Sequence, residues 1–185
     1  MKQKKIKMSK KIIVIGASTS KNSINKTFAN YAGMQLNDVD LLIIDISDYN
    51  TLPIYSVDTE NKNGAPKEVV ELNGLFKSAD GFIISFAEHN GSYAAGYKNV
   101  IDWVSRQYGK VFNDKPTLLL STSPGVRGGA TVLGSAVAAY PHFGANVVDY
   151  FSLSSFHDNF VEGKVSNEDL KSTLLEKIKK FQNSL

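Results

Sequence analysis

The sequence KIIVIGASTSKNSIN, residues 11–25, joins a short apolar run to a polar segment rich in hydroxyl groups. The apolar run is nearly continuous, which is typical of a β-strand covered on both faces. Beyond the polar segment, apolar residues recur at helical spacing, at Ile24, Phe28, Tyr31 and Ala32. The segment therefore predicts a buried strand, a turn and a helix, which together form the first unit of a parallel α/β sheet.

The same unit recurs along the rest of the chain. Four further apolar runs are predicted as strands, at Leu41–Ile46, Gly81–Phe86, Thr117–Ser121 and Asn146–Leu153. Apolar residues at helical spacing mark four more helices, within residues 69–76, 100–108, 132–140 and 170–181. Parallel strands need long crossover connections, and helices supply them. We therefore expect an α/β fold of three layers, a doubly wound sheet of five parallel strands. The pattern Ser166-x-x-Asp169 predicts that Ser166 caps the last helix.

Composition excludes several kinds of site. The 185 residues are 42% hydrophobic and 21% charged, which suits one globular domain. The chain has no cysteine, which rules out disulfides, thiol nucleophiles and cysteine-bound metal centres. Its three histidines lack metal-ligand spacing. No apolar run approaches the roughly 18 residues of a membrane helix, so we expect no membrane insertion and a cytoplasmic location.

The net charge of +3 comes from one end of the chain. Residues 1–11 carry six lysines and no acid, which leaves fifteen basic and eighteen acidic residues, a net charge of −3, for the rest. This balance predicts no nucleic-acid binding by the folded part. We expect residues 1–10 to form a basic flexible tail and residues 11–185 a single domain. The apolar run Ile12–Ile15 is too short for a secretory signal, but a membrane-surface or nucleic-acid role for the basic tail stays open.

The polar turn after the first strand favours an anion. In open parallel sheets, ligands bind beyond the carboxyl ends of the strands. Hydroxyls at Ser18, Ser20 and Ser23 and the amide of Asn25 meet there at a helix N-terminus, whose free N–H groups and dipole attract negative charge. The segment matches neither a Walker loop nor a dinucleotide fingerprint. We interpret it as a phosphate site, with a polar loop capped by Ser23 as the alternative.

Two more polar segments follow neighbouring strands. Residues 87–92 come after the third predicted strand, and residues 121–129 come after the fourth. The second of these contains Gly125, Gly128 and Gly129, which permit positive φ and a close approach of backbone to a flat ligand. Successive N–H groups in such a loop can bind an anion. A purely structural turn is the alternative.

These segments carry recognisable motifs. Residues 16–25 read GASTSKNSIN, residues 87–92 read AEHNGS, residues 97–103 read YKNVIDW, and residues 121–129 read STSPGVRGG. Together they resemble the NADPH-dependent FMN reductase family, which includes azoreductases, quinone reductases and chromate reductases. The resemblance runs from residue 11 to the last helix. The family's third motif, S-x-S-x-G-x-x-G-G, is matched in full, at Ser121, Ser123, Gly125, Gly128 and Gly129.

The resemblance implies a fold, cofactors and partners. The fold is flavodoxin-like, with strand order 2-1-3-4-5. The cofactor is FMN, with NADPH or NADH as co-substrate, and a hydride passes through flavin N5 to a small-molecule acceptor. A homodimer or homotetramer is implied, and no side chain is assigned as an acid or base. The residues that the resemblance assigns to the flavin are Ser18, Ser20, Ser23, Ile24, Asn25, Ala87, Glu88, His89, Asn90, Gly91, Ser121, Ser123, Pro124, Gly125 and Gly128.

Three positions depart from the family pattern. The arginine of the first loop is Ser20 here, and the proline and tyrosine of the second motif are Ala87 and His89. Two other functions stay open, the second of them because of these departures. One is a flavin-binding electron carrier or sensor, although such carriers are usually strongly acidic. The other is a structural relative without flavin. The acceptor and the preferred nicotinamide cannot be read from the sequence.

Overall fold

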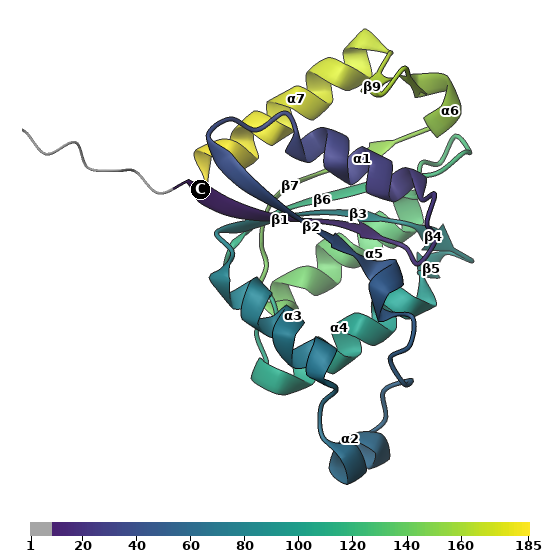
Figure 1. Cartoon of the computed structure of the whole chain (residues 1–185). Coiled ribbons are helices and arrows are strands. Elements are labelled where there is room, and N and C mark those ends of the chain that lie inside the picture. The colour runs from purple at the N-terminus through teal and green to yellow at the C-terminus, as the bar shows by residue number, and fades with distance from the viewer. Residues whose placement is uncertain (1–8) are drawn as a thin grey trace, which may run out of the picture.

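Five parallel strands form the centre of the molecule. A computed structural model describes residues 9–185, apart from the side chain of Tyr108. Its sheet has the order β2-β1-β3-β6-β7, so the predicted flavodoxin-like order 2-1-3-4-5 is confirmed (Figure 1). Residues 1–8, most of the predicted tail, lie outside the described part. The strands are β1 (Lys10–Ala17), β2 (Val39–Asp45), β3 (Gly81–Phe86), β6 (Pro116–Thr122) and β7 (Asn146–Leu153).

Helices cover both faces of this sheet, as Figure 1 shows. One layer consists of α1 (Ile24–Gly33) and α7 (Glu168–Asn183). The opposite layer consists of α3 (Lys67–Ser78), α4 (Ala95–Tyr108) and α5 (Ala130–Ala139). All five helices lie where the apolar spacing predicts them.

A hydrophobic core lies between the sheet and each of the two helix layers. Ile12 and Val14 of β1 pack into the core beneath α1 and α7. Ile13 and Ile15 pack into the other core, beneath α3, α4 and α5. All four side chains are fully buried. Side chains alternate between the faces of a strand, so a continuous apolar run is what a strand covered on both faces requires.

Several short elements carry no apolar periodicity and were not predicted. The long segment after β2 contains the 3-10 helix η1 (Ile46–Tyr49) and α2 (Val57–Asn63), which has no buried residue. A small hairpin, β4 (Glu88–His89) and β5 (Ser92–Tyr93), follows β3. The others are η2 (Tyr140–Phe143), α6 (Phe156–Asn159), β8 (Phe160–Val161) and β9 (Lys164–Val165).

The predicted cap of the last helix is wrong by one residue. Asn167 caps α7, and its side chain accepts hydrogen bonds from the N–H groups of Asp169 and Leu170. The hydroxyl of Ser166 instead donates to the carbonyl of Asp158. The Ser166 hydroxyl, which the sequence pattern assigned to capping, is therefore engaged in a tertiary hydrogen bond with Asp158.

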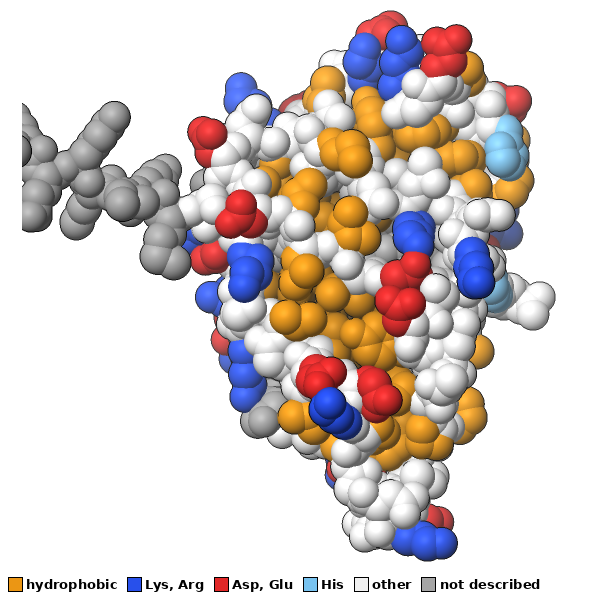
Figure 2. All heavy atoms as spheres, viewed as in Figure 1, with side chains coloured by type: hydrophobic (Ala, Val, Ile, Leu, Met, Phe, Trp, Pro, Cys, Tyr) orange, Lys and Arg blue, Asp and Glu red, His pale blue; other side chains and the backbone are white. Residues whose placement is uncertain are grey.

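On the face shown in Figure 2, hydrophobic side chains gather along the middle, over the edge of the sheet at β2. Leu41 and Ile43 of this edge strand remain 36% and 45% exposed. Within residues 9–185, no helix is long and apolar enough to cross a membrane.

Candidate cofactor-binding cleft

The three predicted segments meet in one cleft. It lies at the carboxyl ends of β1, β3 and β6 and has a volume of about 280 Å³. Predicted residues that line it are Ser18, Ser20, Ser23, Ile24, Asn25, Ala87, Glu88, His89, Ser123 and Pro124. Asn22 and Thr122 also line it and were not predicted, although both adjoin predicted residues at a strand end or helix start. The remaining predicted residues, outside the lining, are Asn90, Gly91, Ser121, Gly125 and Gly128.

The turn between β1 and α1 brings a helix N-terminus into the cleft. A Cβ atom added to Gly16 would lie 2.3 Å from the Cα atom of Lys26, so only glycine permits this close approach of strand and helix. Ser23 caps α1 by accepting a hydrogen bond from the Lys26 N–H at 3.3 Å. The next two residues, Ile24 and Asn25, have first-turn N–H groups for which the helix offers no acceptor. Both residues line the cleft, so this end of α1 is suited to an anion.

The Asn25 side chain joins three elements rather than facing a ligand. Its amide nitrogen donates to the Thr122 carbonyl at 3.0 Å, and its amide oxygen accepts from the Thr122 N–H at 3.0 Å. The same oxygen accepts from the Ser85 hydroxyl at 2.8 Å. Only 2% of Asn25 is exposed. The side chain thus ties α1 to the ends of β3 and β6, and only its backbone N–H remains for the cleft.

The second segment is a tight hairpin. Asn90 and Gly91 have φ values of 52° and 76°, which a two-residue turn of type I′ requires. The dipeptide Asn-Gly between short strands was the signal that could have predicted this hairpin. The turn carries Asn90 and Gly91 to its tip, whereas Ala87 and His89 line the cleft.

Glu88 connects this hairpin with the opposite wall. Its carboxylate accepts a hydrogen bond of 2.9 Å from the N–H of Val132, in the first turn of α5. The wall opposite the hairpin is the third segment, which leads directly into α5. The carboxylate of Glu88 therefore points toward a helix N-terminus in the protein itself.

Hydrogen bonds and close contacts of Gly128 fix the third segment, residues 121–129, on the rest of the protein. Gly128 has φ of 57°, and a Cβ atom there would lie 2.3 Å from the Ser152 hydroxyl oxygen. The Gly128 carbonyl accepts hydrogen bonds from the hydroxyls of Ser121 and Ser152 at 2.8 and 2.9 Å. Ser121 and Gly128 thus position the loop and do not line the cleft. A glycine is required at 128 because both its φ and its contacts exclude a side chain.

The loop after β7 supports the same segment. The Ser155 N–H donates to the Gly125 carbonyl at 2.9 Å, and the Phe156 N–H donates to the Ser123 carbonyl at 3.0 Å. These carbonyls are therefore turned toward the protein. Ser123 and Pro124 form the part of the loop that borders the cleft.

The lining of the cleft carries no formal positive charge among its described residues, since it contains no lysine or arginine. Lys26, one turn into α1, forms an ion pair with Asp45 at the end of β2. Partial burial opposes ionisation of Asp45, but the Lys26 ammonium and the N–H and hydroxyl of Ser47 outweigh it and lower the pKa of this carboxyl. Hydroxyls and backbone N–H groups are thus the available anion donors. In residues 9–185, no group of three or more His, Asp or Glu side chains is placed to hold a metal ion.

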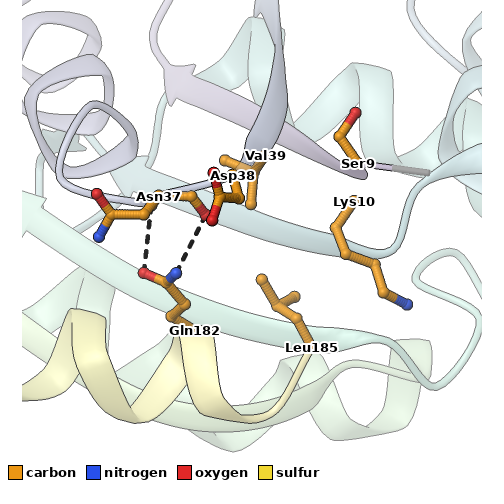
Figure 3. A pocket seen from close by; sticks show the side chains of 7 residues that line it. All are labelled: Ser9, Lys10, Asn37, Asp38, Val39, Gln182 and Leu185. Carbon is orange, nitrogen blue, oxygen red and sulfur yellow. Dashed lines mark hydrogen bonds between the residues drawn. The ribbon is translucent and has the colours of Figure 1, made fainter. Parts of the chain in front are cut away.

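A larger hollow lies at the other end of the sheet. It has a volume of about 620 Å³ and is lined by Ser9, Lys10, Asn37, Asp38, Val39, Gln182 and Leu185 (Figure 3). The Gln182 side chain forms two hydrogen bonds with the backbone of Asn37, and the Lys10 ammonium is paired with Asp80. The Gln182 amide and the Lys10 ammonium are therefore bonded within the protein, in contrast to the free helix N-terminus of the cleft.

Removal of residues 1–8 is expected to leave cofactor affinity within twofold of the full chain. Ser9 and Lys10 lie at the amino end of β1, whereas the cleft lies at its carboxyl end. The eight residues of β1 separate these ends by roughly 25 Å. Flavin titration of the full and shortened chains checks this expectation. A tenfold loss would show that the deleted residues reach the cleft or a partner subunit.

Comparison with known proteins identifies the family. A family model described as NADPH-dependent FMN reductase matches residues 10–158, well over half of the chain. An uncharacterised protein from Mycoplasma pneumoniae is 32% identical over 158 residues, which are 83% of this chain and 92% of that protein. A quinone reductase from Escherichia coli is 39% identical over 79 residues, 43% of this chain and 42% of that enzyme. That match therefore spans less than half the length of the enzyme.

Solved structures agree on the fold. FerB from Paracoccus denitrificans, described as a flavoenzyme NAD(P)H:(acceptor) oxidoreductase, superposes with a TM-score of 0.75. The superposition covers 95% of this chain and 96% of that one, at 24% sequence identity. The motifs, the sheet order and the extent of the family match are mutually consistent, and the chain belongs to the NADPH-dependent FMN reductase family.

Proposed function

We propose that this protein binds FMN in the cleft and uses NAD(P)H to reduce a small acceptor, of which a quinone is the best candidate. The observation that carries the proposal is the convergence of the three motif segments around the free N-terminus of α1. The quinone is supported by the name of the Escherichia coli relative.

The residues present fit the two ends of FMN. The first-turn N–H groups of Ile24 and Asn25 and the hydroxyls of Ser18 and Ser20 form a cradle of donors for a terminal phosphate. The walls at Ala87 to His89 and at Ser123 and Pro124 border the space for a flat ring. FMN held by these residues would supply two-electron chemistry between the nicotinamide and the acceptor, and a quinone that gains two electrons and two protons becomes a hydroquinone. The chain's role is to hold and orient the cofactor.

The family resemblance also supports a homodimer or homotetramer as the working assembly. Light scattering on the purified protein measures this directly. A monomer that binds FMN and turns over would contradict this part of the proposal alone.

Titration of the apo-protein with FMN, riboflavin and FAD tests the site. FMN is expected to bind at least tenfold more tightly than riboflavin, because a phosphate at the α1 N-terminus forms charge-assisted hydrogen bonds worth about 1.5–3 kcal/mol each. Anaerobic addition of NADPH and NADH should then bleach the flavin. Tight FMN binding without bleaching would instead indicate an electron carrier or sensor, and no flavin binding would indicate a structural relative.

Ser20→Arg is expected to tighten FMN binding about tenfold or more, since a guanidinium at this cleft residue adds a charge-assisted contact with a phosphate. Ser172→Arg is the matched control, because it adds the same charge at an exposed site on α7 and should change affinity less than twofold. Equal affinities of both variants for FMN would place the phosphate away from Ser20.

A further inference from the structure

Glu88 caps a helix that belongs to the opposite wall of the cleft. The helix α5 begins after Gly129, which has a left-handed conformation and provides no side-chain cap. Its early N–H groups at Ala130 and Leu133 find backbone acceptors, the carbonyls of Arg127 and Gly129. The N–H of Val132 donates to the Glu88 carboxylate at 2.9 Å, across 44 positions of sequence.

Physical chemistry makes this contact favourable. The first-turn N–H groups of a helix lack intrahelical acceptors, and the positive end of the helix dipole attracts a carboxylate. A hydrogen bond to an ionised acceptor is also stronger than a neutral one. The contact between Glu88 and α5 is thus an N-terminal cap supplied by another element, the hairpin of β4 and β5.

The cap connects the two walls that border the space proposed for the flat ring of the flavin. Ala87 and His89, on either side of Glu88, line one wall. Ser123 and Pro124, in the loop that leads into α5, line the other. Any displacement of the hairpin from α5 would change the distance between these walls.

We propose that Glu88 is a positioning residue, which fixes the separation of the hairpin from α5 and thereby the width of the flavin-binding cleft. The inference rests on the proposed function, since it assigns the cleft to a flavin. It assigns the Glu88 carboxylate to the protein rather than to a direct contact with the ligand.

Two substitutions separate positioning from direct contact. Glu88→Gln keeps an oxygen that can accept the Val132 hydrogen bond, whereas Glu88→Ala removes the acceptor. Asn167→Ala is the matched control, because it removes the side-chain cap of α7, which bonds to Asp169 and Leu170. We expect Glu88→Ala and Asn167→Ala to lower Tm by similar amounts, on the order of 2–4 °C.

Amide hydrogen exchange of the apo-protein, followed by NMR, tests the cap without any flavin. Glu88→Ala should accelerate exchange at Val132 at least fivefold, and Glu88→Gln should accelerate it less than twofold. Asn167→Ala should accelerate exchange at Asp169 or Leu170 and leave Val132 unchanged. An unchanged Val132 rate in Glu88→Ala would overturn the cap.

Titration with FMN tests the positioning role. Glu88→Ala should raise the Kd about fivefold or more, whereas Glu88→Gln and Asn167→Ala should stay within twofold of wild type. A Kd unchanged in Glu88→Ala would overturn the role in cleft width. A Kd raised as much by Gln as by Ala would show that the charge contacts the ligand, which also overturns it. Failure of the wild-type protein to bind FMN contradicts the proposed function and this positioning role together, while hydrogen exchange still decides whether Glu88 caps α5.

Discussion

Asn25→Ala is expected to lower the free energy of unfolding by about 2–5 kcal/mol. The substitution removes three hydrogen bonds at a site that is 2% exposed. It leaves the N–H and carbonyl of Thr122 and the hydroxyl of Ser85 without these partners, and buried groups that lose a partner carry the full cost of desolvation. The substitution also releases α1 from β6, so FMN affinity should fall with stability.

Asn22→Ala is the control for this prediction. Asn22 lines the same cleft but is exposed, so its replacement should change the free energy of unfolding by less than about 0.5 kcal/mol. Urea denaturation of the two apo-proteins gives both values. Equal stability of the two variants would show that the Asn25 side chain does not tie α1 to β3 and β6.

Gly16→Ala is expected to destabilise the protein by several kcal/mol, about 3 or more, through a backbone clash. The added Cβ atom would lie 2.3 Å from the Cα atom and 2.6 Å from the backbone nitrogen of Lys26. The clashing atoms belong to the backbone of α1, which cannot move aside as the end of a flexible side chain could. Relief of the clash therefore requires α1 to move away from β1, and this movement opens the anion-binding turn.

Gly74→Ala has the opposite expected sign. Gly74 lies inside α3, and a Cβ atom there would meet nothing within 4 Å. Alanine in a helix interior is more stable than glycine by about 0.5–1 kcal/mol, so this variant should gain stability. Urea midpoints of the two glycine variants provide the comparison. A stable, fully folded Gly16→Ala protein would contradict the close approach of β1 and α1.

Much of the fold follows from local pattern. Residues such as Ile12 and Ile13 belong to an uninterrupted apolar run, and the run requires a strand covered on both faces. The helix that contains Phe28 and Ala32 can be predicted equally well, because its buried residues repeat at helical spacing. Elements that bury nothing, such as α2, leave no such pattern and could be found only in the structure.

The candidate site was predictable in position but not in side-chain direction. Polar segments at the ends of neighbouring parallel strands must lie at one edge, so the meeting of Ser18, Ala87 and Ser123 follows from the strand order. The directions of Asn25 and Glu88 do not follow, because their partners, Thr122 and Val132, are distant in the sequence.

The sequence by itself determined the five strands, their helices, the edge of the sheet that holds the cleft and the family motifs. These features depend on periodicity, glycine and local turn chemistry, which act over a few residues. Only the tertiary structure decided which polar side chains remain for a ligand. A buried amide or a carboxylate beside a helix N-terminus binds whichever donor or acceptor the packing places within about 3 Å, and Asn25 and Glu88 find theirs within the protein.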